Sequence, residues 1–241
     1  MVALLLVALG GTAAAETLIG TDAGEQLTGT SGPDQIYAEG GDDSIDALAG
    51  NDYLEAGPGH DIIDAGAGAD LVIAGTGDDR ITAGEGDDVV YAGAGGDEIV
   101  GGTGNDRLFG QVGDDRIFAG PGDDRIWAGA GANYVDAGSG NDLIASEGAS
   151  ILLGGPGRDT IVAHGPRLRV DGGPGADRIR TRGGADEVSG GLGRDAISTG
   201  GGDDVIDARD GERDVVDCGK GRDTVYADSD DTLRRCERVM P

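Results

Sequence analysis

A nine-residue period runs through most of this chain and limits what it can fold into. The phrase Gly41-Asp42-Asp43-Ser44-Ile45 returns nine residues later as Gly50-Asn51-Asp52-Tyr53-Leu54, with the same order of glycine, aspartate and apolar residue. Thirteen uninterrupted units fill residues 29–145. A short fixed period is typical of solenoids, in which each unit packs only on its neighbours. The period therefore predicts a repeat architecture rather than a globular domain.

Each unit divides into a turn and a strand. We number its positions one to nine, so that aspartate stands at six and an apolar residue at eight, as in residues 29–37. Positions one to six hold small residues, glycine and aspartate, which favour turns. Positions seven to nine predict a short strand, with position eight facing inward together with the small residue at position one. Two units would make one coil of about 18 residues, giving an all-β parallel solenoid of about 11 coils with two sheets and two rows of turns.

The charge of the chain bears on its partners. It carries 46 acidic and 18 basic residues, a formal charge of −28, and 50 of its 241 residues are glycine. Phosphate binding needs a basic surface, so this balance argues against nucleic acid and anionic lipid as partners. A chain this acidic would ordinarily be disordered. Its strict periodicity indicates order instead, provided that something neutralises the repeated carboxylates.

The stacked aspartates are the candidate metal ligands. At 18 residues per coil, aspartates of alternate units lie above one another about 5 Å apart and repel unless a cation binds. Calcium prefers several oxygen ligands, including short carboxylate side chains held in glycine-rich loops. The sequence therefore predicts multiple Ca²⁺ ions, and the alternative is a metal-free solenoid with ordinary turn aspartates. The candidate side-chain ligands are Asp34, Asp43, Asp52, Asp61, Asp70, Asp79, Asp88, Asp97, Asp106, Asp115, Asp124, Asp142, Asp159, Asp177, Asp186, Asp195, Asp204 and Asp223.

The consensus Gly-Gly-x-Gly-x-Asp-x-U-x, with U apolar, resembles the glycine-rich nonapeptide repeat of RTX proteins. The resemblance covers residues 20–226, although position one is often alanine here. It implies a right-handed parallel β-roll that holds Ca²⁺ between successive turns. It also implies that backbone carbonyls of loop glycines complete the sites, namely Gly41, Gly50, Gly59, Gly68, Gly77, Gly86, Gly95, Gly104, Gly113 and Gly122. The second acid at position five, as in Asp87, is interpreted as solvated surface charge.

The pattern predicts six segments along the chain. Residues 1–15 combine an apolar run with Ala13-Ala14-Ala15, as in a signal peptide; the alternative is a buried N-terminal helix. The remaining segments are a cap with a degenerate first repeat at 16–28, the regular roll at 29–145, irregular acid-poor coils at 146–171, a second repeat segment at 172–226 and a C-terminal cap at 227–241. In the irregular stretch one row of turns loses its acids.

Two cysteines suit an exported chain. A single disulfide between Cys218 and Cys236 is expected near the C-terminus, and the alternative is two free thiols. An extracellular or cell-surface location also fits the high calcium concentrations outside cells.

Aromatic residues gather on one predicted sheet. Position nine at a stride of 18 includes Ile73, Tyr91, Phe109 and Trp127. Two interpretations remain open: cross-strand stacking that stiffens the sheet, or a contact surface for a protein partner or a second copy.

No catalytic motif emerges, because His60 and His164 are isolated and Lys220 lacks a phosphate-loop frame. Threonines form no ladder, so an ice-binding face is not expected. The sequence favours an exported, non-catalytic protein that folds on binding Ca²⁺. The alternatives are a cell-surface or matrix adhesion protein that uses the aromatic sheet, and a detached C-terminal module of a secreted hydrolase or toxin.

Overall fold

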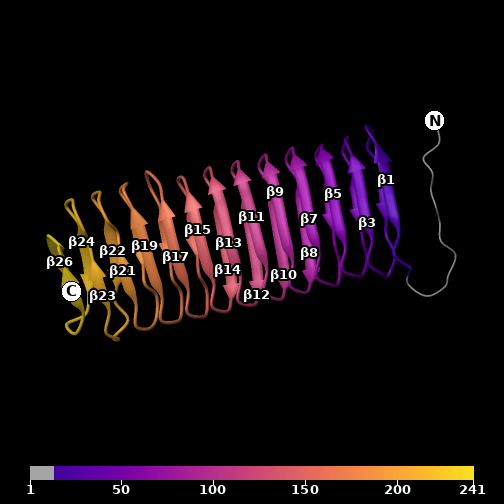
Figure 1. Ribbon diagram of the computed structural model, residues 1–241. Coiled ribbons are helices and arrows are strands. Elements are labelled where there is room, and N and C mark those ends of the chain that lie inside the picture. The colour runs from indigo at the N-terminus through magenta and orange to yellow at the C-terminus, as the bar shows by residue number, and fades with distance from the viewer. Residues whose placement is uncertain (1–13) are drawn as a thin grey trace.

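The computed structural model describes residues 14–241, which wind into one long two-layered rod (Figure 1). Every strand pairs in parallel with the strand one coil later, and the usual register is 18 residues, as in Leu108 with Ile126. The predicted parallel solenoid is confirmed. The predicted signal peptide lies outside the described residues apart from Ala14 and Ala15. Within residues 14–241 no helix is long and apolar enough to cross a membrane.

Two sheets of 13 strands each form the layers, and the chain alternates between them. The first, sheet A, contains β1 (Thr17–Thr21), β3 (Gln35–Glu39), β5 (Tyr53–Pro58), β7 (Leu71–Thr76), β9 (Val89–Ala94), β11 (Arg107–Val112), β13 (Arg125–Ala130), β15 (Leu143–Glu147), β17 (Thr160–His164), β19 (Arg178–Arg182), β21 (Ala196–Ser198), β23 (Val215–Asp217) and β25 (Thr232–Arg234). The second, sheet B, contains β2 (Gln26–Thr28), β4 (Ser44–Asp46), β6 (Ile62–Asp64), β8 (Arg80–Glu85), β10 (Glu98–Thr103), β12 (Arg116–Pro121), β14 (Tyr134–Ser139), β16 (Ile151–Leu153), β18 (Arg169–Asp171), β20 (Glu187–Ser189), β22 (Val205–Ala208), β24 (Thr224–Ala227) and β26 (Arg238–Met240).

The core is only two side chains deep, as the repeat predicts. Position eight supplies fully buried Ile, Val or Leu, such as Ile126, and position one supplies buried small residues, such as Ala128. Positions seven and nine point outward, so that strand β13 alternates between buried and accessible side chains. A core this thin buries little apolar area per residue, and the backbone hydrogen bonds between coils therefore carry much of the cohesion.

The strands differ in length from the prediction. Between β7 and β14 they run for six residues, through positions seven to nine and on into positions one to three of the next unit. The expectation of a six-residue turn is therefore wrong there, because small residues at positions one to three also let the backbone pair with the next coil. The roll also has 13 strands per sheet rather than about 11 coils, since residues 16–28 and 227–241 contribute strands as well.

Two irregularities in the repeat appear as register shifts. One residue is missing within β15, between Ala145 and Ser146, where the pairing with β13 jumps from Trp127 to Gly129. One residue is added in the loop before Asp214, so that Ala196 pairs with Val215. The first change is absorbed as a bulge in the β13–β15 pair and the second in a turn, and the strands continue to stack.

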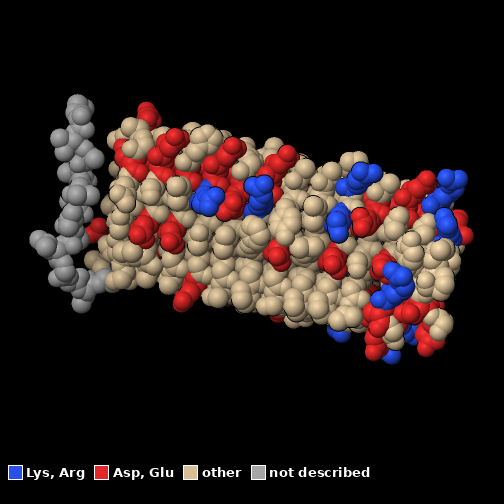
Figure 2. All heavy atoms as spheres, turned by 180° about the vertical axis from the view of Figure 1, so that it is seen from behind, with Lys and Arg blue, Asp and Glu red and all other residues tan. Residues whose placement is uncertain are grey.

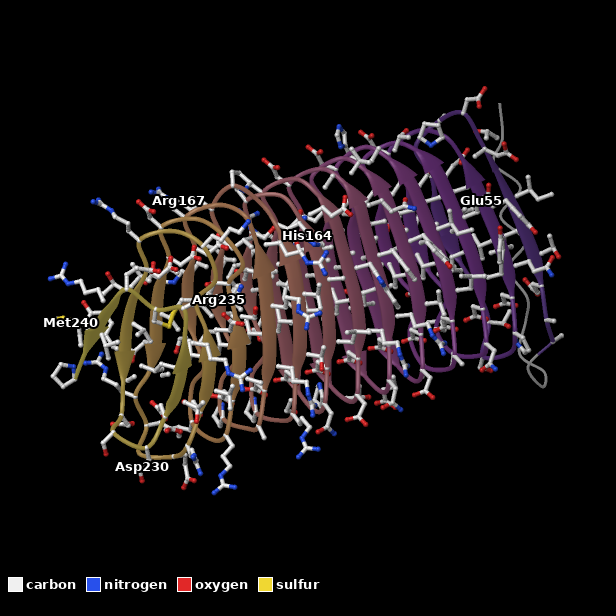
Figure 3. All side chains as sticks on the ribbon, turned by 60° about the vertical axis from the view of Figure 1, so that its left-hand side comes forward. Glu55, His164, Arg167, Asp230, Arg235 and Met240 are labelled. Atoms are coloured by element: carbon white, nitrogen blue, oxygen red, sulfur yellow. A yellow bond between two sulfur atoms is a disulfide. The ribbon has the colours of Figure 1, made fainter. Side chains whose placement is uncertain are left out.

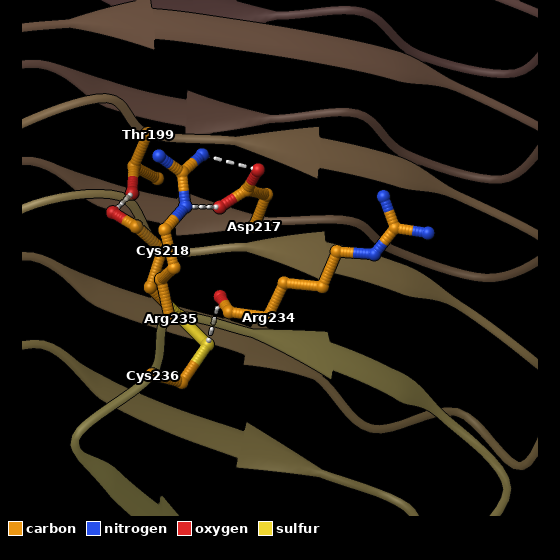
Figure 4. A network of polar contacts seen from close by, with 6 residues as sticks. All are labelled: Thr199, Asp217, Cys218, Arg234, Arg235 and Cys236. Carbon is orange, nitrogen blue, oxygen red and sulfur yellow. Dashed lines mark hydrogen bonds and ion pairs between the residues drawn. A yellow bond between two sulfur atoms is a disulfide. The ribbon is translucent and has the colours of Figure 1, made fainter.

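The C-terminal end is held by a covalent link between coils (Figure 4). Cys218 and Cys236 form the predicted disulfide and are separated by 18 residues, or one coil. Cys218 is buried at the position of the inner alanines, and its carbonyl accepts a hydrogen bond of 2.8 Å from the hydroxyl of Thr199. Arg235 forms an ion pair with Asp217 across the same two coils.

The close approach of successive turns predicts a steep cost for side chains at position four. Gly122 has a φ of 150°, and an added Cβ would lie 1.6 Å from the carbonyl oxygen of Gly104. Gly183 has a φ of 68° but open space around it. We expect Gly183→Ala to cost about 1 kcal/mol for the backbone conformation. Gly122→Ala should cost clearly more, because two turns must separate. Thermal unfolding of the calcium-loaded variants tests this, and equal losses of Tm would contradict it.

Candidate calcium sites in the turns

The aspartates at position six form two ladders along the rod. Each is buried just before a strand, and its Oδ1 accepts the backbone N–H of the residue at the same position one coil earlier, which is usually an aspartate. Asp106, for example, donates its N–H to Oδ1 of Asp124 at 2.8 Å, and Asp88 donates to Oδ1 of Asp106 at 2.9 Å. The predicted stacking of aspartates 18 residues apart is therefore present, and it is joined by hydrogen bonds that the sequence pattern did not suggest.

The second carboxylate oxygen of nearly every ladder aspartate has no partner. Eighteen Oδ2 atoms are buried without a hydrogen bond among the described residues. A charged oxygen buried in this way is costly unless a proton or a cation neutralises it. The aspartates concerned are Asp43, Asp52, Asp61, Asp70, Asp79, Asp88, Asp97, Asp106, Asp115, Asp124, Asp142, Asp159, Asp177, Asp186, Asp195, Asp204, Asp214 and Asp223.

Burial perturbs these carboxyls in the absence of metal. Desolvation, followed by the charges of neighbouring aspartates, raises the pKa of Asp70, Asp106 and Asp142 to about 7, although their backbone hydrogen bonds oppose the shift. The pKa of Asp115 is raised to about 6 for the same main reason. The metal-free turns therefore favour protonated aspartates near neutral pH, and a bound cation would reverse that preference.

One turn shows what the orphaned oxygens face. Asn133 replaces aspartate in the second ladder, keeps the ladder bond from Asp115 at 2.9 Å, and donates its amide to the carbonyls of Ala128 and Gly129, both at 3.3 Å. In an aspartate turn a carboxylate oxygen takes the place of that amide. It can donate nothing, so negative oxygen and carbonyl oxygens lie together. Such a set of oxygen atoms is what Ca²⁺ binds.

The glycines at position one show the same small space. A Cβ added at Gly101 would lie 2.7 Å from Oδ2 of Asp106 and 2.6 Å from the carbonyl oxygen of Ala119, one coil further on. These two oxygens therefore border one cradle between successive coils. The residues present fit a calcium ion, which would supply the positive charge that these turns lack.

Comparison with known families agrees with this chemistry. The family model of the RTX calcium-binding nonapeptide repeat matches eight stretches, at residues 19–54, 46–81, 64–99, 73–108, 91–124, 109–144, 143–165 and 171–206. The chain belongs to the RTX calcium-binding nonapeptide repeat family. The fold and the repeated aspartates are thus those of a calcium-binding RTX β-roll.

Among the solved structures that match, a β-helical protein is similar over most of the chain. It is the X-ray crystal structure of a hyperactive, Ca²⁺-dependent, β-helical antifreeze protein from an Antarctic bacterium, with a TM-score of 0.53 and 24% sequence identity. The similarity covers 91% of this chain and 86% of that one, and at this identity it supports the fold alone. Comparison with curated proteins gives no match.

The RTX ladders differ from the predicted ligand set at both ends. Asp34, a predicted ligand, already has partners for Oδ2, because the backbone N–H of Thr30 lies 2.6 Å away and its hydroxyl 3.1 Å away. Asp214 was missed, because the inserted residue shifts it out of the nine-residue count. It nevertheless occupies the ladder, with its Oδ1 accepting the N–H of Asp195 at 2.9 Å. Its place before Val215-Val216 was the signal that could have identified it.

In the acid-poor coils, the turns of the second ladder contain no carboxylate oxygen without a partner. In the second ladder, Asn133 is followed by Ser150, whose hydroxyl lies 2.8 Å from that of Ser146. Leu168 follows and fills the next turn with a fully buried apolar side chain. The first ladder continues through the same coils with Asp142 and Asp159, whose Oδ2 atoms remain without partners. The predicted irregular stretch therefore lacks candidate ligands on one side only.

The glycine carbonyls predicted as ligands lie between successive turns. A Cβ added at Gly68 would meet the carbonyl oxygen of Gly50 at 1.4 Å, and one at Gly77 would meet that of Gly59 at 1.6 Å. These oxygens therefore point along the rod towards the next coil. Their participation in metal binding stays a prediction, as does that of the carbonyls of positions one and two.

Position five forms a separate outer ladder. Asp87 and Asp123 are exposed, and their Oδ1 atoms accept the backbone N–H groups of Asn105 and Asn141 at 2.8 Å. These hydrogen bonds lower the pKa of both aspartates. In residues 14–241 no three side chains of His, Cys, Asp or Glu gather as a metal cluster. Each turn offers one buried carboxylate, and a calcium ion would take most of its other oxygens from the backbone.

The Asn133 turn allows a gain-of-site test. We expect Asn133→Asp to add at least one calcium ion, because it restores a carboxylate opposite the carbonyls of Ala128 and Gly129. Native mass spectrometry counts the ions. The control is Ala132→Asp, which adds the same charge at the exposed position five. An equal gain in both variants, or none in either, would contradict the assignment of Oδ2 to the metal.

The raised pKa values also predict how the metal-free fold responds to pH. Asp79 and Asp177 have a pKa of about 7 in the roll against 3.8 ordinarily, so folding takes up protons. Without calcium, the stability from these groups is full below about pH 4 and is lost as the pH rises through about 7. Calcium competes with the protons, so its affinity should fall below pH 7. Circular dichroism of dialysed protein between pH 8 and 4 checks the first point, and calcium titration checks the second. A metal-free signal independent of pH would contradict it.

Proposed function

We propose that the chain is an exported, non-catalytic RTX protein that folds into a rigid rod on binding multiple Ca²⁺ ions. The observation that carries the proposal is the set of 18 buried carboxylate oxygens without a partner. A chain of charge −28 with so thin a core has little to hold it against its own repulsion. Binding free energy from the ions is then folding free energy.

The two carboxylate oxygens of each ladder aspartate have different roles. The Oδ1 atoms hold successive turns together through the backbone, while the Oδ2 atoms remain available to a cation, as in Asp88. The glycines let successive turns approach closely and leave space between the coils. Calcium, when bound, supplies the positive charge for this oxygen set. Because oxygens of two successive coils border each cradle, as Asp106 and Ala119 do, calcium bound there would favour binding at the next turn.

Export is supported by the redox chemistry of the chain. The disulfide between Cys218 and Cys236 suits an oxidising compartment. Calcium is abundant outside cells and could saturate sites of moderate affinity there. The apolar run within residues 1–15 supports the same location, as a signal peptide would.

The surface of the rod supports a non-catalytic role. A shallow hollow on sheet B is lined by Asp171, Pro174, Leu192 and Asp207, and the carboxylate of Asp207 is already paired with Arg209 at 2.8 Å. His60 lies in a turn after β5, and His164 ends β17, many coils away. We do not extend ice binding to this chain, because position nine of sheet A carries Tyr, Glu, Ile, Phe and Trp rather than a row of threonines.

Calcium titration of the mature chain tests the proposal. Far-UV circular dichroism should show a disordered chain in chelator at pH 8 and a cooperative gain of β-structure between micromolar and about 10 mM Ca²⁺. Magnesium is the matched control, because it is smaller and demands a stricter octahedral geometry. Full β-structure in chelator at this pH would overturn the coupling of folding to metal, and an equal response to Mg²⁺ would overturn the selectivity for calcium.

A further inference from the structure

An apolar strip runs along the outer face of sheet A. It consists of the position-nine side chains of six successive strands, β7 to β17: Ile73, Tyr91, Phe109, Trp127, Ala145 and Val162. All six are half-buried in the isolated chain. At position seven, Leu71, Val89 and Leu143 widen the strip. The outer face of sheet B instead mixes apolar side chains with charged ones such as Asp46, Asp64 and Asp136.

The aromatic rings of the strip stack on one another. Tyr91 and Phe109 have ring centroids 4.6 Å apart, and Phe109 and Trp127 are 4.7 Å apart, with interplanar angles of 10° and 4°. The cross-strand stacking that was one of the two sequence interpretations is therefore present. Because each ring face meets its neighbour, the edges point outward. The strip thus suits a flat apolar partner better than a sugar ring, which would need a free aromatic face.

The ends of the strip carry opposite charges. Glu55, exposed on β5, precedes Ile73 at the N-terminal end. Arg178, Arg180 and Arg182, all exposed on β19, follow Val162 at the other end. Within residues 14–241 these three arginines form no ion pair. Figure 3 labels Glu55 towards the N-terminal end of the rod and His164, in the strand before β19, further towards the C-terminal end.

The net charge of the chain also differs between its N-terminal and C-terminal parts. Residues 1–157 contain 28 acids and 4 bases, a charge of −24, whereas residues 158–241 contain 18 acids and 14 bases, a charge of −4. Figure 2 shows basic side chains gathering towards the C-terminal end of one face. Residues 1–157 hold 11 of the orphaned carboxylates and residues 158–241 hold 7. One Ca²⁺ for each would change the net charges of these two parts to −2 and +10. Calcium loading therefore reduces the electrostatic repulsion between copies, while the N-terminal part stays more negative than the C-terminal part.

Along sheet A, the strands of the strip and of its two charged ends are arranged symmetrically about one midpoint. The midpoint lies between β11 and β13, and β5 and β19 are each the fourth strand from it. We propose that two calcium-loaded copies pack sheet A against sheet A in antiparallel orientation, about a twofold axis between Phe109 and Trp127. Glu55 then faces the partner's Arg180. Large Tyr91 faces the partner's small Ala145.

The same twofold axis also brings the side chains at position seven of the two copies opposite one another. Tyr53 faces the partner's Arg178, which suits a cation–π contact, and Val89 faces the partner's Leu143. The two arginines nearest the axis, Arg107 and Arg125, would approach those of the partner. Their charge is offset within each copy by Asp87 and Asp123, whose pKa values they help to lower.

The dimensions allow a stable but modest interface. From β5 to β19 the face spans about 34 Å at roughly 4.8 Å per strand, and a strand of five residues is about 17 Å long. Two such faces bury on the order of 1,200 Å², at the lower end of specific interfaces. The proposal rests on calcium-dependent folding, because the metal-free chain at −28 would repel a second copy.

Analytical ultracentrifugation of the calcium-loaded protein tests the dimer. We expect twice the chain mass at high protein concentration. Glu55→Arg and Arg180→Glu should each weaken association about tenfold, since each places like charges at two symmetric contacts. The double variant Glu55→Arg with Arg180→Glu restores complementarity and should recover the dimer. Monomers at every concentration, or no recovery in the double variant, would overturn the proposal.

Matched controls lie on the opposite face. Asp46→Arg on β4 and Arg169→Glu on β18 make the same charge changes at exposed positions of sheet B and should leave the dimer constant unchanged. A larger effect of these controls than of the sheet A variants would also refute the interface. Circular dichroism of each variant in calcium shows that it is folded. Loss of β-structure in calcium would count against the proposed function, whereas a folded monomer counts only against the dimer.

Discussion

In each acidic turn, one oxygen of a buried aspartate points towards backbone carbonyl oxygens and has no donor to meet it. The other oxygen already accepts a hydrogen bond from the backbone of the coil before it, as Asp124 does from Asp106. The aspartate therefore cannot turn away without breaking the ladder. Only a proton or a cation relieves the contact, and near neutral pH a cation must do so if the carboxylate is charged. We propose for this reason that folding and metal binding are one process.

The glycines make that arrangement possible. Turns one coil apart are so close that a methyl group at Gly122 would overlap the carbonyl of Gly104. The same closeness brings carboxylate and carbonyl oxygens of successive coils to the edge of one space. The thin core contributes regular spacing, because one large apolar and one small residue per unit fix the distance between the sheets. Core, glycine and aspartate thus depend on one another at every period.

Most of the fold and of the aspartate ladders could be predicted from the nine-residue period alone. The wrong or missing predictions concern a few places along the chain. The nine-residue count placed 17 of the 18 orphaned aspartates, but it lost Asp214 at an insertion. It also could not foresee that Thr30 would partner Asp34. The strand length was misjudged because pairing at positions one to three depends on the neighbouring coil, not on propensity within the unit. The hydrogen bonds of the ladder, such as that from Asp34 to Asp52, required coordinates, since a spacing does not reveal which oxygen accepts.

The turns without acids explain why the rod need not be metal-bound everywhere. Asn133, the pair Ser146 and Ser150, and Leu168 replace a charged oxygen by an amide, two hydroxyls and an apolar side chain. All three lie in one ladder, while the other remains acidic beside them. One side of these coils therefore has no buried carboxylate oxygen without a partner, whereas the other side would depend on calcium under the proposed function. Such coils could stay folded at calcium concentrations too low for the fully acidic turns, and they would then offer a stacked template on which the neighbouring coils assemble in both directions.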